Sequence, residues 1–311
     1  MRIVLIGGSG FLGRFVVREL VADGHLCTVL TRSTRRARSF ALQPGARVAC
    51  ADVYAVEELV RQMDGAGAVV SMAGILNERG FSGKGFRRVH VELVKGIIEA
   101  AARAGVRRLL HVSALNAGKG TSHYLQTKGE AEELIRQSGL DYTIFQPSVI
   151  FGEGDQFFNR FADLLRWTPV LPLACPDARL QPVFAGDVAA AMAAALEDSG
   201  AVGRSYQLAG PRVFTLQELV QWTARAIGRR TWVPGLPPVL SRLQGLVMDW
   251  VPGKPFSSDN YRSLQTDNVA DRNALEHFGI VPGSVASIVP DYLGTSIHQR
   301  RLSEIRKQAR R

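Results

Sequence analysis

"GGSGFLG", residues 7–13, decides the fold, because it sets glycines at positions 7, 10 and 13 between two apolar segments. The preceding "MRIVLI" is a short β-branched run typical of a strand buried on both faces. The following "FLGRFVVRELVADGH", residues 11–25, places its apolar residues at helical spacing. In such a strand–turn–helix unit the first glycine permits a tight turn, the second admits a pyrophosphate and the third lets helix and strand pack closely. The stretch therefore predicts a dinucleotide site at the helix N-terminus.

The chain as far as residue 152 keeps alternating between predicted strands and predicted helices. Further apolar runs typical of strands cover residues 26–32, 46–53, 67–74, 107–115 and 141–152, and helical patterns cover residues 86–106 and 122–139. Strands that alternate with helices imply a parallel sheet with right-handed crossovers. We therefore predict an α/β fold, a Rossmann-type doubly wound parallel sheet with its ligands at the carboxyl ends of the strands, and a smaller C-terminal substrate lobe.

The domain boundaries follow from a change of rhythm after Gly152. Prolines at 169, 172, 176, 182, 234, 237 and 238 mark irregular segments, whereas "AGDVAAAMAAALED", residues 185–198, is typical of a helix. We predict a dinucleotide-binding domain over residues 1–151, with 181–200 returning to it. Residues 152–295 are expected to form mainly the smaller lobe, and residues 296–311 form a basic tail.

The end of the second predicted strand indicates which dinucleotide is bound. An NAD site usually carries an acidic residue there for the ribose hydroxyls. This chain has Thr31 and then Arg32, whose guanidinium matches a ribose phosphate. We therefore predict NADP(H) in preference to NAD(H), which stays the alternative. Asp52 is either an adenine contact or a solvated turn residue, and the nearby Arg35, Arg36 and Arg38 are expected to be solvated loop residues.

The predicted cofactor contacts come from the strand ends and the glycine loop. They are Gly7, Gly8, Ser9, Gly10, Phe11, Leu12, Gly13, Thr31, Arg32, Asp52, Val53, Met72, Ala73, Gly74, Val112, Tyr124, Lys128, Pro147, Ser148 and Val149.

The candidate catalytic residues are Tyr124, Lys128 and Ser113. Tyr124 and Lys128 stand four residues apart and share one face of the predicted helix that follows the fifth strand. A lysine ammonium beside a tyrosine favours the phenolate, which makes the tyrosine usable as an acid or base near neutral pH. The spacing is common by chance, and it gains weight here from its place at the predicted switch point of the sheet.

The motifs of the chain resemble those of a known family. They are "GGSGFLG", "HVSAL", "YLQTK", "QPSVIFGEGDQFFNRF", "QPVFAGDVA", "YQLAGP" and "TDNV". They resemble extended short-chain dehydrogenases/reductases of the atypical type, in the branch of the nucleotide-binding accessory subunit of mitochondrial complex I and its bacterial relatives. The resemblance implies a Rossmann-type fold, bound NADP(H) and, for several relatives, a structural role or one tied to quinone metabolism.

Two departures from the family pattern leave two functions open. Leu115 takes the place where active members carry a carbonyl-binding hydroxyl, so Ser113, Thr121 or Ser122 would have to replace it. His90 stands where many relatives have asparagine, and we expect it to pack or cap rather than to catalyse. Losing one oxyanion-type donor costs about 10²–10³ in rate, which is a handicap rather than abolition. We therefore predict an oxidoreductase or isomerase acting on a carbonyl or alcohol substrate, with a non-catalytic accessory or assembly subunit as the alternative.

Composition bounds the partners and the location. The net charge of +10 is concentrated in the loop after residue 31 and in the tail, so nucleic acid is not a predicted partner. The three cysteines lack metal-ligand spacing and suggest reduced, buried thiols, so we predict no metal and a cytoplasmic location. The tail is either a solvated end or a basic amphipathic helix for the inner membrane face or an acidic protein. The apolar stripe over residues 239–251 usually marks packing within a lobe, although an exposed version would suit a membrane surface.

Overall fold

The computed structural model describes residues 1–32, 44–78, 80–252 and 254–293. Arg35, Arg36, Arg38 and the predicted basic tail over residues 296–311 lie outside the described residues.

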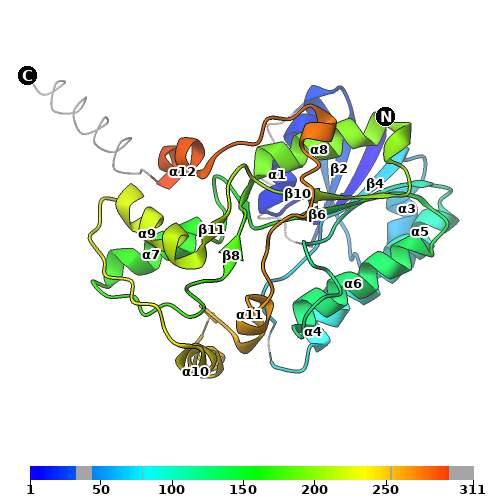
Figure 1. Cartoon of the computed structure of the whole chain (residues 1–311). Helices are drawn as coiled ribbons and strands as arrows, with labels where there is room; N and C mark the ends of the chain where they lie inside the picture. The colour runs from blue at the N-terminus through cyan, green and yellow to red at the C-terminus, as the bar shows by residue number, and fades with distance from the viewer. Residues whose placement is uncertain (33–43, 79, 253, 294–311) are drawn as a thin grey trace, which may run out of the picture.

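A seven-stranded parallel sheet forms the centre of the molecule (Figure 1). Its strands are β1 Arg2–Ile6, β2 Leu26–Thr31, β3 Ala46–Cys50, β4 Ala68–Ser71, β5 Arg108–Val112, β6 Asp141–Pro147 and β10 Arg204–Leu208. The spatial order is β10-β6-β5-β4-β1-β2-β3, so the chain reverses direction across the sheet between β1 and β4. This order confirms the predicted doubly wound fold and puts the switch point beside the glycine loop.

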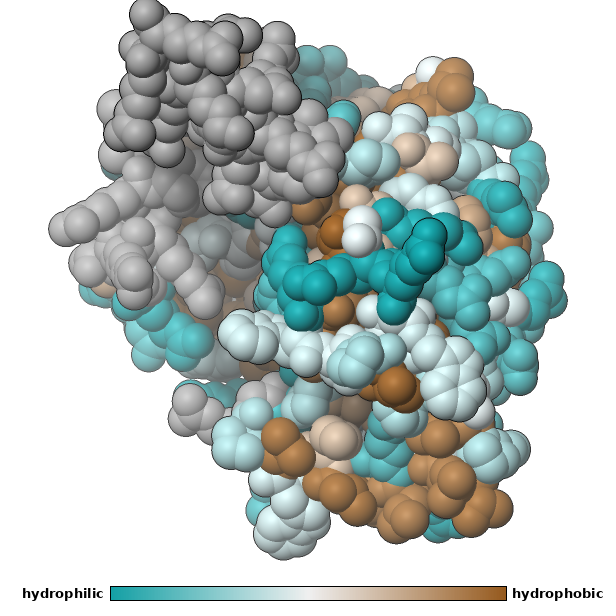
Figure 2. Space-filling view, turned by 90° about the vertical axis from the view of Figure 1, so that its left-hand side faces the viewer, coloured by the Kyte–Doolittle hydropathy of each residue, from teal (hydrophilic) through white to brown (hydrophobic). Residues whose placement is uncertain are grey.

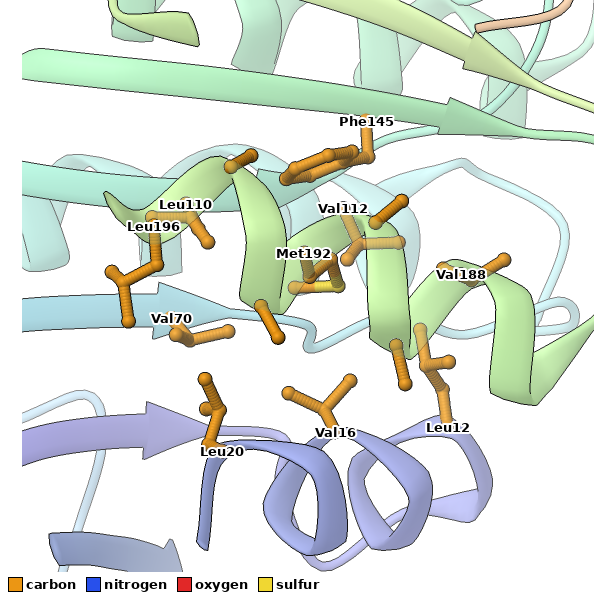
Figure 3. Packing of buried hydrophobic residues seen from close by; sticks show 14 of the residues in the cluster. Leu12, Val16, Leu20, Val70, Leu110, Val112, Phe145, Val188, Met192 and Leu196 are labelled. Carbon is orange, nitrogen blue, oxygen red and sulfur yellow. The ribbon is translucent and has the colours of Figure 1, made fainter. Parts of the chain in front are cut away.

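Helices cover both faces of this sheet. On one face, α1 Phe11–Ala22 and α8 Ala185–Glu197 pack against each other and against the sheet. Figure 3 shows how Val16 and Leu20 of α1 and Met192 of α8 meet Val70 and Val112 of the strands. On the other face lie α3 Val56–Met63, α5 Leu93–Arg103 and α6 His123–Arg136. The helix that the sequence predicts over residues 185–198 is α8, whose apolar residues pack in the core of the sheet.

The edge strand β10 differs from the prediction, which had only the six preceding strands. Its sequence "RSYQL" is mostly polar, and its first two residues are exposed. An edge strand has one partner and is half solvated, so it lacks the continuous apolar run by which buried parallel strands are recognised.

The long helix predicted over residues 86–106 is interrupted. It consists of α4 Lys84–Arg87, a π-helical turn over Arg88–Glu92 and then α5. A π-helical turn changes the direction in which the following side chains point, and such turns are frequent at functional sites. This one carries His90 into the interior beside α6.

A smaller lobe, which we define as the elements around the apolar cluster of Phe158, Leu219 and Val289, lies at the carboxyl side of the sheet (Figure 1). Its elements are β7 Ile150–Phe151, α7 Phe158–Trp167, β8 Arg179–Leu180, β9 Val183–Phe184, β11 Phe214–Thr215, α9 Leu216–Ala226, α10 Pro238–Met248, α11 Ser258–Ser263 and α12 Val285–Leu293. The 3₁₀ turns Ser199–Ala201 and Glu276–Phe278 instead pack beside α8 on the core of the sheet.

The cysteines and the helices bear on the expected location. Cys27 is buried as predicted, but Cys50 is exposed and Cys175 half-buried, so the prediction of three buried thiols was wrong. Cys50 ends β3 at the sheet edge, where it has little cover. No helix within the described ranges is long and apolar enough to cross a bilayer.

Candidate active site

The glycine loop between β1 and α1 is built so that only glycine fits at two of its positions. Gly7 has a φ of +83°, and a Cβ there would lie 2.6 Å from the backbone N of Ala73. A Cβ on Gly13 would lie 2.1 Å from the carbonyl O of Gly8. Gly10 caps α1 without a side-chain acceptor, and the first turn carries no acidic residue. The first N–H groups of α1 are therefore not satisfied by a side chain at the cap, which suits an anionic ligand.

The ends of β2 and β3 meet around the ring of Tyr54. Thr31 is buried at the end of β2, while Arg32 is exposed and its guanidinium carbon lies 5.7 Å from the centroid of the Tyr54 ring. Arg88, from the π-helical turn, lies 4.6 Å from the same centroid. Asp52 is exposed and accepts a hydrogen bond from the Tyr54 N–H at 3.1 Å. Within the described chain neither Arg32 nor Arg88 has an acidic partner within 4.0 Å, so two uncompensated cations converge here.

Lys128 joins the ends of β4 and β5 to α6. Its ammonium donates a hydrogen bond of 3.0 Å to the carbonyl O of Val112, and a Cβ on Gly74 would lie 3.5 Å from Nζ. The side chain is buried, and burial lowers its pKa from the ordinary 10.5 to about 8, opposed by the attraction of Glu132. The structure thus brings together Gly74, Val112 and Lys128, three of the residues predicted from sequence. At neutral pH the lysine keeps its proton and places a positive charge at the switch point.

Tyr124 stands one helical turn before Lys128, at the start of α6. Burial raises the pKa of its phenol from 10.0 to about 12 in the protein alone. The phenol ring packs edge-on against the rings of Phe86 and His90. Its hydroxyl makes no hydrogen bond within the part of the chain that the structure describes. The hydroxyl is therefore free to meet a substrate oxygen.

A row of charged residues continues from Lys128 along α6, and the sequence analysis missed it. Glu132 is buried and accepts hydrogen bonds from Arg136 at 2.6 Å and from the amide of Gln146 at 2.9 Å. Residues 124, 128, 132 and 136 lie at i, i+4, i+8 and i+12, so they share one helix face. The four-residue spacing of these charged side chains is visible in the sequence. Because this helix must also pack on the sheet, that spacing could have predicted the row.

We expect Lys128→Met to stabilise the cofactor-free protein at pH 7. In the folded protein the pKa of Lys128 is about 8, whereas its ordinary value is 10.5. Between these two pH values the unfolded chain therefore binds more protons than the folded one. The cost of burying the charge is therefore fully present below pH 8 and is lost as the pH rises to 10.5. This cost of burial is about 3 kcal/mol, because one pKa unit corresponds to roughly 1.4 kcal/mol. The hydrogen bond to Val112 that the substitution removes is worth only about 1 kcal/mol, so the variant should be the more stable protein.

Denaturant unfolding of both proteins at pH 7 and at pH 10 measures this difference in free energy of unfolding. The advantage of Lys128→Met should be largest at pH 7 and smaller at pH 10, and Lys95→Met, at an exposed position of α5, serves as the control. A variant that is less stable than wild type at both pH values would show that the charge is better solvated than its burial implies.

The three hydroxyls that were considered as replacements at position 115 differ in availability. Leu115 is only 1% exposed and offers no hydrogen-bond donor from its side chain. The Ser122 hydroxyl is the N-cap of α6 and accepts the N–H of Leu125 at 3.1 Å. Thr121 is exposed, whereas the Ser113 hydroxyl is buried and has no hydrogen-bond partner among the described residues. A buried, unpaired hydroxyl is uncommon, so Ser113 keeps its place as the candidate.

His90 is held as a neutral packing residue. Thr127 donates its hydroxyl proton to the carbonyl O of His123 at 2.7 Å, so its oxygen accepts from Nδ1 of His90 at 2.9 Å. The Nε2 atom is then an acceptor and receives the N–H of Ile75 at 3.3 Å. Burial and the charge of Lys128 lower the pKa of His90 to about 2. This geometry supports the expected packing role for His90. The described residues contain no group of three His, Cys, Asp or Glu side chains that could hold a metal.

Two lobe residues reach the site, and neither was predicted. Asp259 of α11 accepts the N–H groups of His123 at 2.8 Å and Tyr124 at 3.1 Å, so a buried carboxylate caps α6. Asn268 accepts the hydroxyl of Ser148 at 2.5 Å, which ties the loop after β6 to the lobe. Both contacts span more than 100 residues of sequence, and no local pattern announces them.

The remaining predicted cofactor residues follow strand ends. Ala73 lies beside the glycine loop, as the close approach to Gly7 shows, and Met72 directly follows β4. Pro147 ends β6, and the carbonyl O of Val149 is taken by the N–H of Val183 at 2.9 Å. The strand ends thus bring these residues to the carboxyl edge of the sheet.

Known proteins resemble this chain in sequence and in fold. A family model described as NAD(P)H-binding matches residues 7–158. The chain is 30% identical over 297 residues to NADH dehydrogenase (ubiquinone) 1 alpha subcomplex subunit 9, mitochondrial, of Mus musculus, covering 89% of this chain and 76% of that protein. It is 25% identical over 317 residues to photosystem II assembly factor Ycf39 of a Synechocystis strain, covering 98% of this chain and 94% of that protein. The fold is similar to that of the NADPH-dependent quinone oxidoreductase QOR2 of Escherichia coli, solved with NADPH, with a TM-score of 0.76. The two chains are 21% identical, and the match covers 94% of this chain and 100% of that one.

Proposed function

Because the chain belongs to the NAD(P)H-binding family of atypical short-chain dehydrogenase/reductase-like proteins, we propose that it is an NADP(H)-dependent oxidoreductase of a carbonyl or alcohol substrate. One observation carries the proposal. The charged, buried Lys128 lies against Val112 and Gly74 at the switch point of the sheet, one helical turn from an unpaired tyrosine hydroxyl. A purely structural core has no reason to bury a cation there, since desolvation makes it costly.

The proposed roles follow from the positions of the groups. Bound NADPH supplies a hydride to the substrate carbon. Tyr124 gives its phenolic proton to the substrate oxygen. In the reverse reaction, the oxidation of an alcohol, the phenolate of Tyr124 takes the hydroxyl proton back. Lys128 stabilises the resulting phenolate, because a cation beside a phenol lowers the phenol pKa. Ser113 is the candidate second donor to the substrate oxygen. Turnover of candidate quinone-related and sugar carbonyl compounds with NADPH, followed at the nicotinamide absorbance, tests the proposal.

The preference for NADP(H) rests on the two arginines at Tyr54. A ribose 2′-phosphate is a doubly charged acceptor that two guanidinium groups can bind from different sides. Arg32 was predicted for this role from the sequence, and we propose Arg88 as a second residue for it, because the π-helical turn carries Arg88 to the same ring. An NAD site would place an acidic residue at the end of β2, where this chain has Thr31.

We expect Arg88→Ala to weaken NADPH binding about 10- to 100-fold, since a hydrogen bond to a charged group is worth about 1.5–3 kcal/mol. NADH binding should change less than twofold, because NADH has no phosphate there. Arg87→Ala is the matched control, since Arg87 is the neighbouring residue but pairs with Glu130 at 2.8 Å. Titration calorimetry with both cofactors measures the effect. An equal loss for NADPH and NADH would remove Arg88 from the phosphate site.

A second function is favoured by Leu115. Its buried, apolar side chain stands where active relatives would bind the substrate carbonyl, which fits a cofactor-holding accessory or assembly subunit of a membrane-associated complex. Two relatives have such names, a complex I subunit and a photosystem II assembly factor. Tight NADPH binding without turnover of any carbonyl compound would favour the accessory or assembly function over the oxidoreductase. In either case we propose a cytoplasmic protein that is peripheral at the inner membrane face.

A further inference from the structure

Helix α10 carries an apolar face that nothing in the described structure covers. Ser241 and Gly245 turn inward, and Gly245 packs against the start of α11. The opposite side of the helix is apolar and exposed. Its exposed residues are Val239, Leu240, Leu243, Leu246, Val247 and Trp250, the last of them just beyond the helix end. We call this set the α10 face. Figure 2 shows hydrophobic side chains along the lower edge of the molecule, where α10 lies in Figure 1.

Exposed tryptophans accompany the α10 face. Trp250 is 80% exposed at one end of α10, and its ring lies 5.4 Å from that of Phe81, which is also exposed. Trp232, 69% exposed, lies in the segment that leads into α10, and the neighbouring Trp167 is 90% exposed. A backbone bridge between Val170 and Trp232 places these last two segments side by side. Tryptophan combines an apolar ring with a polar N–H, and it is enriched where a protein meets the interface of a bilayer.

Exposed basic residues lie on α10 and in the segment that leads into it. Arg242 is exposed on α10 itself, and Arg229 and Arg230 are exposed just before Trp232. None of these three makes an ion pair within the described residues. The acidic residue next to the helix, Asp249, is buried. An anionic surface would therefore complement Arg242, which lies on the same helix as the apolar side chains, and the two arginines of the preceding segment.

We propose that the α10 face docks on an anionic lipid bilayer, with α10 lying in the plane of the headgroups. An amphipathic helix with tryptophan and basic residues beside its apolar face binds such a surface by burying the apolar side chains and attracting anionic headgroups. A second copy of the chain fits less well. In a two-fold contact Arg242 would meet the same apolar face of its partner, where α10 offers no exposed acid.

This docking would bring the candidate active site close to the bilayer. A cleft beside the Phe81–Trp250 pair is lined by residues of the loop before α4, by residues of α11 and by His123, which directly precedes the candidate catalytic Tyr124. Phe86, Lys254 and Asp259 also line it. Lys254 bridges the two sides, because its ammonium donates to the carbonyl O of Gly80 at 2.7 Å. The docking itself does not depend on the proposed oxidoreductase activity.

Flotation of the full-length protein with vesicles of 70% phosphatidylcholine and 30% phosphatidylglycerol tests the proposal. We expect wild type to float with the vesicles and the double variant Leu243→Glu/Val247→Glu to lose at least tenfold in binding. Val281→Glu is the matched control, since Val281 is 89% exposed but lies outside α10, and its binding should be unchanged. Because all three proteins keep the basic tail, their differences report on α10. Brominated lipid should quench the fluorescence of Trp250. Comparison of wild type with Trp250→Phe shows which part of the quenching comes from this residue.

Three outcomes would overturn the proposal. One is wild type that stays in solution with these vesicles. Another is a double variant that floats as well as wild type while deletion of residues 298–311 abolishes flotation, which would assign binding to the tail. The third is a wild-type dimer that the double variant turns into a monomer, without any vesicle binding, which would assign the α10 face to a second copy. NADPH binding by the double variant verifies that it is folded.

Discussion

Tyr124→Phe should reduce turnover by about 10²–10⁴, the usual worth of a positioned acid or base, while NADPH binding changes little. The substitution removes only the hydroxyl. That hydroxyl has no hydrogen-bond partner among the described residues, so its loss leaves the packing of the ring against Phe86 and His90 in place. We therefore expect an unchanged unfolding temperature together with a large loss in kcat. The measurement is steady-state turnover with NADPH and the best substrate found for wild type.

Tyr142→Phe is the control for this prediction, because Tyr142 lies at the far, amino-terminal end of β6 and should leave kcat unaltered. Turnover by Tyr124→Phe at the wild-type rate would remove the tyrosine from the chemistry. If wild type itself binds NADPH tightly and turns over no carbonyl compound, the accessory-subunit function is favoured and the tyrosine is a packing residue.

The features that sequence predicts best are those that depend on neighbouring residues. The glycine loop and the Tyr124–Lys128 pair are set by spacings of three and four residues, and the parallel, doubly wound sheet follows from the alternation of strands and helices. Arg88, Asp259 and Asn268 reach the site only through the fold. Each is an ordinary polar residue in its own segment, and its partner stands 34 to more than 100 residues away. Sequence reasoning from one chain has no access to such pairs.

The α10 face shows a second limit of the same kind. Its helical period was visible in the sequence, but a stripe that packs on a lobe and a stripe that faces solvent have the same period. The inward positions are Ser241 and Gly245, small residues that let α11 approach closely. In this helix the small residues mark the packed side and the large apolar ones the free side, the reverse of the usual arrangement.

Gly13→Ala should be the most disruptive single methyl group that can be added to the cofactor site. The new Cβ would lie 2.1 Å from the carbonyl O, 2.4 Å from the carbonyl C and 2.5 Å from the Cα of Gly8, all of them backbone atoms that cannot rotate away. Relief requires α1 to move off the glycine loop, and α1 carries Val16 and Leu20 of the core. We expect a loss of about 3 kcal/mol in the free energy of unfolding, at the upper end for overpacking. NADPH binding should fall at least 100-fold, because the helix N-terminus leaves the pyrophosphate position.

Gly96→Ala separates this clash from the general effect of replacing a glycine in a helix. A Cβ on Gly96 would meet only Val56 Cγ2, at 3.7 Å, which is an ordinary contact. Alanine is favoured over glycine inside a helix by about 1 kcal/mol, so this control should be as stable as wild type or more stable. Thermal unfolding and NADPH titration of both variants give the comparison. Wild-type affinity and unfolding temperature in Gly13→Ala would mean that α1 can shift without loss, and that the loop does not hold the cofactor in the way that its geometry implies.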